Sequence, residues 1–284
     1  MDTAFRPYRS VLYIPGSKER ALDKARGLAC DAIIFDLEDA VTPDAKGEAR
    51  ETLKAALAQD GYGERAKIIR INGLDTDWGA DDVKVLKDAG ADAFLLPKVN
   101  SVADVEALDA LMGDTMDIWC MIETPLGVFN ALEIAAHPRV KGFVAGTNDL
   151  AKELNCRNRD DRLPMMFALQ QMLLAARAYG VICVDGVYNQ YLDEEGLAAE
   201  CEQGRDLGFD GKTLIHPAQV EGANKAFAPS EAEVDLAKRQ IAAHEEIEKT
   251  GQGVAVVDGK IVENLHVETA KKTLAKAEAI ARMA

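Results

Sequence analysis

The sequence predicts an α/β fold, a (β/α)8 TIM barrel that carries a C-terminal extension. Eight short apolar runs alternate with longer amphipathic runs over about the first 227 of 284 residues. Eight buried strands, each followed by a helix, are typical of a closed parallel barrel. The first turn, Pro15-Gly16-Ser17-Lys18, has neither of the glycine-rich phosphate motifs that open many doubly wound sheets. The barrel is therefore favoured over an open sheet.

The expected strands are apolar almost throughout, which is the pattern of parallel strands buried on both faces. They are Ser10–Ile14, Ala32–Phe35, Lys67–Ile71, Ala93–Leu96, Ile118–Ile122, Gly142–Ala145, Val181–Val184 and Gly211–Ile215. The amphipathic runs between them predict helices, several of which are followed by a glycine that ends the helix. These helices are Lys18–Leu28, Asp44–Gln59, Asp77–Asp88, Ser101–Met112, Gly127–Ala136, Pro164–Tyr179 and Glu194–Leu207.

The barrel pattern ends near Phe227, so we expect a catalytic domain at residues 1–227 and an extension at residues 228–284. The extension is too small for a large core of its own and should dock on the barrel or on a neighbouring subunit. Its expected elements are a capped polar helix that starts near Ser230 and reaches about Lys249, a hairpin that turns at Asp258-Gly259, and a last helix from about Val267 to Met283.

Composition excludes several classes of protein. The chain has 33 Lys+Arg and 48 Asp+Glu, a formal charge of −15, which argues against non-specific nucleic-acid binding. No apolar run is long enough to span a membrane, and the first residues lack the apolar core of a signal peptide. Five scattered cysteines without a C-x-x-C pair favour a reduced, cytoplasmic chain. The four histidines have no metal-ligand spacing, which argues against a zinc site.

Charged or polar residues directly follow seven of the expected strands, at the face where barrel active sites lie. Glu123 and Asp149 follow adjacent strands, so their carboxylates can converge. Two carboxylates without His or Cys favour Mg²⁺, with Mn²⁺ as an alternative, over zinc. Each carboxylate has other interpretations, as a helix cap or a salt-bridge partner, and together they resemble the general acid/base pair of a glycosidase.

Arg70 lies at the end of a buried strand, where a guanidinium is costly unless it meets an anion. That anion is a substrate carboxylate or enolate oxygen, or else Asp36, Glu38 or Asp39, and both interpretations can hold together. Lys98 has the same two interpretations. His216, before a proline, fits a packed loop histidine better than a catalyst. Three cations in the first loop and helix either grip phosphates or form an ordinary solvated surface: Lys18, Arg20 and Lys24.

The ordered set of these strings resembles the HpcH/HpaI aldolase and citrate lyase β-subunit superfamily. The long extension is similar to that of its CoA-thioester branch rather than to the tailless pyruvate aldolases. The matching strings are Arg9-Ser10-Val11-Leu12-Tyr13-Ile14-Pro15-Gly16, Asp36-Leu37-Glu38-Asp39-Ala40-Val41, Arg70-Ile71-Asn72-Gly73, Pro97-Lys98, Ile122-Glu123-Thr124-Pro125, Gly211-Lys212, Ile215-His216-Pro217 and Asp258-Gly259-Lys260.

The resemblance implies Mg²⁺ on Glu123 and Asp149, and Arg70 on the keto-acid or enolate oxygen. It implies that a CoA thioester is bound by substrate-contacting residues, namely Tyr13, Lys18, Lys24, Arg70, Glu38, Asn148, Ile215 and His216. It also implies a homotrimer or homohexamer whose extension closes as a lid over a neighbour's active site. Lyases of this branch place an aspartate base in the lid, whereas the aligned residue here is Glu263, with Asp258 close by as the other candidate.

The implied activity is on (3S)-malyl-CoA or a close 3-hydroxyacyl-CoA. Either the thioester is hydrolysed, or retro-Claisen cleavage yields glyoxylate and acetyl-CoA. Two alternatives stay open: a citryl-CoA lyase β-subunit that works with partner subunits, and a non-catalytic CoA-binding protein. The intact set of Glu123, Asp149 and Arg70 argues against the second alternative.

Overall fold

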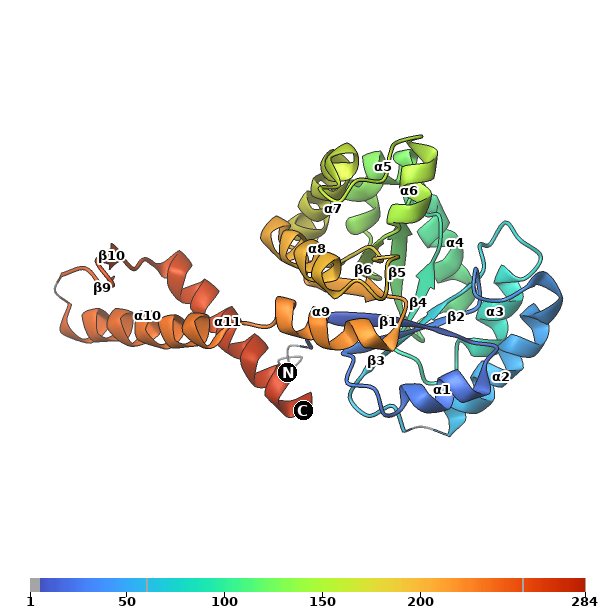
Figure 1. Cartoon of the computed structure of the whole chain (residues 1–284), viewed down its shortest axis with the longest axis horizontal. Coiled ribbons are helices and arrows are strands. Elements are labelled where there is room, and N and C mark those ends of the chain that lie inside the picture. Colours follow the sequence, from blue (N-terminus) through green and yellow to red (C-terminus); the bar gives the residue numbers. More distant parts are fainter. Residues whose placement is uncertain (1–5, 60, 252, 284) are drawn as a thin grey trace. The chain divides into compact units, whose positions relative to one another are not determined.

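Eight parallel strands close into a barrel in sequence order, with β1 paired to both β2 and β8 (Figure 1). The structure is a computed structural model and describes residues 6–59, 61–251 and 253–283. The predicted barrel is confirmed. Its strands are β1 (Ser10–Pro15), β2 (Ala32–Asp36), β3 (Ala66–Arg70), β4 (Ala93–Leu96), β5 (Asp117–Ile122), β6 (Val140–Ala145), β7 (Ile182–Asp185) and β8 (Gly211–Leu214).

Helices surround the strands on the outside of the barrel (Figure 1). They are α1 (Glu19–Ala25), α2 (Lys46–Ala58), α3 (Gly79–Leu86), α4 (Val102–Met112), α5 (Pro125–Ala135), α6 (Thr147–Glu153), α7 (Met166–Tyr179), α8 (Glu194–Leu207) and α9 (Val220–Phe227). Short 3₁₀ turns precede α2, α7 and α9: η1 (Pro43–Ala45), η2 (Leu163–Met165) and η3 (Pro217–Gln219). Sequence patterns predicted seven of these helices within a few residues and missed α6 and α9, which are 7 and 8 residues long.

Alternate strand residues face either the barrel interior or the surrounding helices, because successive side chains point to opposite faces of a strand. Val11, Ile34, Ile68 and Leu95 belong to one buried cluster, while their chain neighbours belong to the larger cluster under the helices. Two residues further along the chain from Ile34 and Ile68 are Asp36 and Arg70, which the register pairs directly. The interior positions thus change from apolar to charged at the carboxyl ends of the strands.

The chain divides into two compact units, one formed by Tyr8–Phe227 and the other by residues 228–283 with residues 6 and 7. The second unit contains α10 (Glu231–Thr250), α11 (Asn264–Met283) and a hairpin of β9 (Val256–Val257) and β10 (Lys260–Ile261). Its small core contains Ala255, Val262 and Val267. Asp258 and Gly259 both have positive φ, 51° and 74°, as a two-residue hairpin turn of this kind requires.

The helices in the described part of the chain include none that is both long and apolar enough to cross a membrane.

A buried group of charges joins β7, β8 and α8. The Lys212 Nζ donates to Glu200 Oε1 at 2.6 Å, to Asp185 Oδ2 at 3.2 Å and to the carbonyl of Gly186 at 2.6 Å. Arg162 Nη1 donates to both oxygens of Asp185 at 2.7 Å. Burial alone would raise the pKa of Asp185, but Lys212 and Arg162 hold that pKa below its ordinary value. The charges therefore stabilise the fold as a set in which each ion has a partner.

We predict that Lys212→Met lowers the free energy of unfolding by roughly 3–5 kcal/mol, since removing one partner leaves buried carboxylates uncompensated. Lys225→Met is the matched control, because Lys225 is exposed on α9 and its replacement should change stability by less than about 0.5 kcal/mol. Urea unfolding followed by circular dichroism measures both changes. Equal midpoints for the two variants would contradict a stabilising role for the buried group.

Candidate active site

A cavity of about 380 Å³ opens at the carboxyl ends of the barrel strands. Its walls come from the residues that end or follow β1, β2, β3, β5, β6, β7 and β8, so it lies where barrel active sites lie. The charged lining residues are mainly acidic. The lining residues are Tyr13, Pro15, Asp36, Asp39, Ala40, Arg70, Met121, Glu123, Ala145, Gly146, Thr147, Asn148, Asp149, Val187, Thr213 and Ile215.

Arg70 is buried in this wall and is surrounded by carboxylates. Its Nε and Nη2 donate to the two oxygens of Asp36 at 2.8 and 2.6 Å, a bidentate pair. Its Nη1 lies 2.8 Å from Glu38 Oε2 and 3.2 Å from Asp39 Oδ2. The Tyr13 ring covers the guanidinium at 5.0 Å. The expected ion pair therefore exists with all three acidic candidates, and it fixes the guanidinium at the edge of the cavity.

Glu123 lies at the end of β5 and is 2% exposed. The pKa of its carboxyl is raised to about 8, chiefly by burial; the charges of Glu38 and Asp149 act in the same direction, while the Lys98 amide and Arg70 oppose them. Glycine is required at position 146, because a Cβ there would lie 2.3 Å from the Cβ of Glu123 and 2.5 Å from its Oε2. The close approach of β6 thus helps to hold the Glu123 side chain in the cavity wall.

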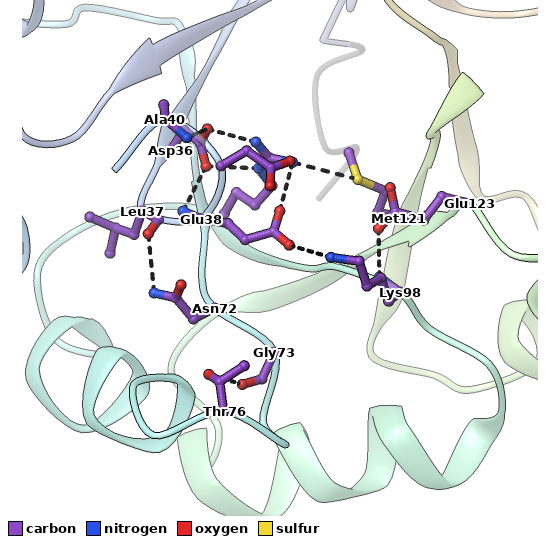
Figure 2. Close-up of polar contacts among 12 residues, drawn as sticks. Asp36, Leu37, Glu38, Ala40, Asn72, Gly73, Thr76, Lys98, Met121 and Glu123 are labelled. Carbon is purple, nitrogen blue, oxygen red and sulfur yellow. Dashed lines mark hydrogen bonds and ion pairs between the residues drawn. The ribbon is translucent and has the colours of Figure 1, made fainter. Parts of the chain in front are cut away.

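Lys98 connects Glu123 to the carboxylates around Arg70. Its backbone N–H donates to Glu123 Oε1 at 2.8 Å, and its Nζ donates to Glu38 Oε1 at 2.8 Å (Figure 2). Lys98 adopts a φ of 51°, a left-handed conformation that costs a non-glycine residue on the order of 1 kcal/mol. This strained backbone aims the amide at Glu123. The string Pro97-Lys98 marked the position in the sequence, but no sequence signal predicts the positive φ.

Asp149 lies in the first turn of α6, directly after β6, and is only partly buried. Within the described residues, its carboxylate has neither a hydrogen bond nor an ion pair. Glu123 likewise has one oxygen that accepts no hydrogen bond from the described residues. Two under-satisfied carboxylates that face one cavity are the donor set of a hard divalent cation.

The donor set fits Mg²⁺ better than a metal enclosed entirely by protein. No group of three or more His, Cys, Asp or Glu arranged to hold a metal occurs among residues 6–59, 61–251 and 253–283. Mg²⁺ is usually bound by one or two carboxylates and keeps several waters or substrate oxygens. Glu123 and Asp149 meet that description, whereas a structural zinc site would need four protein ligands.

The other expected substrate contacts divide into two groups. Tyr13, Asn148 and Ile215 line the cavity. Glu38 does not line it but forms an ion pair with Arg70, which does. Asn148 is held by a reciprocal amide pair with Asn189, at 2.8 and 3.3 Å.

The remaining three expected contacts, Lys18, Lys24 and His216, are exposed and do not line the cavity. His216 Nδ1 accepts the backbone N–H of Ala218, and its ring packs on Tyr191, as expected for a loop histidine.

The two candidate bases of the extension differ in their surroundings. Asp258 Oδ1 accepts a hydrogen bond from Arg239 Nη1 at 2.7 Å, and this partner lowers the pKa of Asp258. Glu263 is exposed, and its backbone N–H donates to His266 Nδ1 at 3.0 Å. In the described part of the chain, the Glu263 carboxylate has no hydrogen bond or ion pair. Of the two residues, Glu263 has the carboxylate that is available to a ligand.

Comparisons with known proteins agree with this geometry. A (3S)-malyl-CoA thioesterase from Cereibacter sphaeroides is 66% identical over 275 residues, which cover 97% of this chain and 96% of that protein. The citrate lyase subunit beta of Leuconostoc mesenteroides subsp. cremoris is 36% identical and covers 95% of this chain and 93% of its own.

A solved structure of protein CitE from Mycobacterium tuberculosis, in complex with magnesium, acetoacetate and coenzyme A, superposes with a TM-score of 0.78. It is 30% identical and covers 96% of this chain and 98% of that one. The family model for HpcH/HpaI aldolase/citrate lyase matches residues 9–217. The chain therefore belongs to the HpcH/HpaI aldolase/citrate lyase family of enzymes.

Proposed function

We propose that this enzyme hydrolyses (3S)-malyl-CoA in a Mg²⁺-dependent reaction. Water adds to the thioester carbonyl, the C–S bond breaks, and malate and the CoA thiol are released. The observation that carries the proposal is the convergence of Glu123, Asp149 and Arg70 on one cavity. The 66% identity to (3S)-malyl-CoA thioesterases selects the substrate class.

A second candidate activity is C–C cleavage of the same thioester to glyoxylate and acetyl-CoA. It is favoured by the relatives named as citrate lyase β subunits and by the family of aldolases and lyases to which the chain belongs. In that reaction a base takes the proton of the 3-hydroxyl, the C–C bond breaks, and the enolate of acetyl-CoA takes up a proton. A citryl-CoA lyase β-subunit role remains the alternative that would require partner subunits.

Glu123 and Asp149 would hold Mg²⁺, which supplies Lewis-acid chemistry and a template for the substrate oxygens when bound. The neighbouring Mycobacterium tuberculosis structures in complex with magnesium support this choice of metal over Mn²⁺. Lys98 keeps Glu123 in place through its amide. Arg70, already fixed by Asp36, binds and orients an anionic oxygen of the substrate without having to reorganise.

We assign the base to Glu263 and the lid to residues 228–283. The pairing of Asp258 with Arg239 supports this choice, because a carboxylate with a lowered pKa is a poorer proton acceptor. A closed lid would keep bulk water from the reacting atoms, and Glu263 would take a proton from the attacking water or from the 3-hydroxyl. Glutamate is one methylene longer than aspartate. This offset would change whether the carboxylate reaches the attacking water or the 3-hydroxyl.

The exposed substrate contacts, the compartment and the assembly form part of the same proposal. Exposed Lys18 and Lys24, with His216, would meet the phosphates and the outer part of CoA, beyond the cavity where Tyr13 and Ile215 contact the inner part. The enzyme would work in the cytoplasm as a homotrimer or homohexamer. The five cysteines, all free thiols, support a reducing compartment.

Replacement of either metal carboxylate should abolish both metal binding and turnover. For Glu123→Gln and Asp149→Asn we expect Mg²⁺ affinity to fall by more than about 100-fold, the upper loss seen for outer partners of metal ligands. Calorimetric titration with Mg²⁺ measures binding, and release of free thiol from malyl-CoA measures turnover. Glu153→Gln is the control, because Glu153 is exposed on the same helix as Asp149. Full activity in either metal variant would exclude the assignment.

Arg70→Lys should lower kcat/KM by about 10²- to 10³-fold, because lysine cannot keep the bidentate pair with Asp36 and still reach a substrate oxygen. Arg9→Lys is the control: Arg9 makes an equally buried bidentate pair, with Asp31, just before β1. Thermal melts of both variants separate stability from catalysis. Equal losses of kcat/KM in the two variants would mean that Arg70 acts only through the fold.

Glu263→Gln should lower kcat by at least about 100-fold, the lower range for loss of a general base, with little change in KM. Asp258→Asn, which lies in the same hairpin region, should keep kcat within a few-fold of the parent. Free thiol and glyoxylate are assayed separately, so that loss of hydrolysis and loss of C–C cleavage are distinguished. If Asp258→Asn lowers kcat more than Glu263→Gln does, the base is Asp258.

A further inference from the structure

Lys46, the first residue of α2, holds its ammonium group inside the protein. The residue is 6% exposed, and its Nζ lies 5.4 Å from the centre of the Trp78 ring, within the range of a cation–π contact. The Nζ donates to the carbonyl of Leu37 at 2.9 Å and to the carbonyl of Glu38 at 2.7 Å. A lysine is rarely buried unless it is paired, and within the described part of the chain this ammonium forms no ion pair. Its contacts with two backbone carbonyls therefore indicate a role in holding that backbone.

The two carbonyls belong to the peptide groups on either side of the Glu38 Cα. Each peptide group is planar, so the backbone freedom between the two planes is the φ and ψ of Glu38. An ammonium that binds both carbonyls therefore restricts that φ and ψ, and with them the direction in which the Glu38 side chain leaves the backbone. The N–H groups of the same turn are held by Asp36, whose carboxylate accepts from Glu38 at 2.9 Å and from Ala40 at 3.1 Å. Side chains thus hold both the carbonyls and the N–H groups of this turn.

The direction of the Glu38 side chain matters because both of its carboxylate oxygens have partners. Oε2 lies 2.8 Å from Arg70 Nη1, and Oε1 accepts from Lys98 Nζ at 2.8 Å (Figure 2). These partners come from the ends of two different strands, and a hydrogen bond weakens steeply as its distance and angle change. A rotation of the Glu38 backbone would therefore break at least one of the two contacts. Lys98 in turn directs its amide at Glu123, so the effect of such a rotation would extend to that carboxylate.

We propose that Lys46 is a positioning residue of the candidate active site. By holding the backbone of Glu38, it keeps the Glu38 carboxylate between Arg70 and Lys98, and so keeps Glu123 in place for Mg²⁺. Lys46 does not line the cavity, so it acts through Glu38 and not on a ligand. This inference rests on the metal site proposed above. In the alternative, Lys46 only anchors α2 to the barrel, and its loss would lower stability without lowering metal affinity.

Charge and position have opposite effects on Mg²⁺ affinity when Lys46 is replaced by a neutral residue. Loss of a positive charge near the acidic cavity would by itself strengthen Mg²⁺ binding, because like charges repel. Loss of the positioning contact would weaken it. We therefore expect Lys46→Met to lower Mg²⁺ affinity by about 10-fold, the lower range for loss of an outer partner of a metal ligand. A fall in affinity is a result that neither the lost charge nor a purely structural role would produce.

A double-mutant cycle with Glu38→Ala tests the route of the effect. In the Glu38→Ala background, Lys46→Met should change the Mg²⁺ Kd by less than about two-fold, because the carboxylate that Lys46 positions is absent. Calorimetric titration of the full chain with magnesium chloride measures the four Kd values and requires no turnover. Lys54→Met is the matched control: Lys54 is exposed on the same helix, and its variant should keep the Kd of the parent.

Unchanged or stronger Mg²⁺ binding by folded Lys46→Met, or an equal loss in both backgrounds, would overturn the inference and leave the metal assignment intact. A parent enzyme that does not bind Mg²⁺ would overturn both. If Lys46→Met does not show the circular dichroism of the parent, Lys46→Gln, which is uncharged and one atom shorter than lysine, replaces it in the same cycle. That variant should also lose affinity in the parent background and not in the Glu38→Ala background.

Discussion

The pair of Arg70 with Asp36 is the interaction on which the candidate site depends. A guanidinium and a carboxylate this deeply buried are stable only together, and strand register places them side by side on β3 and β2. From this pair the polar network extends through Glu38 to Lys98, and from the Lys98 amide to Glu123. Glu123 and Arg70 are thus positioned by one continuous set of contacts.

Much of this arrangement was predictable from the sequence, because the ends of the strands can be recognised in it. A charged residue directly after an apolar run lies at the carboxyl end of a strand, and in a parallel barrel all of those ends meet at one face. The rule places Glu123 at this face directly. Arg70, near the end of its run, and Asp149, four residues after Ala145, come from the same ends of their strands. The same strand pattern also locates the barrel, because each run is apolar along its length. The observed strand boundaries differ from the expected ones by only one or two residues at most ends.

Features that depend on tertiary contacts were beyond sequence reasoning. The positive φ of Lys98 follows from the need to aim an amide at Glu123, and lysine has no preference that reveals it. Helix α6 holds Asp149, yet no helix was expected over its seven residues, which directly follow the turn at Gly146. The likeness of Asp258 and Glu263 in the sequence hides a difference set by Arg239, which lies 19 positions before Asp258 on α10.

The charge balance of the cavity gives a physical reason for a divalent cation. Asp36, Asp39, Glu123 and Asp149 line it and Glu38 adjoins it. Arg70 is the cation in the lining, and Lys98 and Lys46 lie beside Glu38. Burial is the main cause of the raised pKa of Glu123, and the charges of Glu38 and Asp149 act in the same direction. An anionic acyl group would meet the same repulsion on entry. A cation between Glu123 and Asp149 would remove that repulsion and give the substrate oxygens a partner. The acidity that would repel an anionic thioester would therefore also attract such a cation.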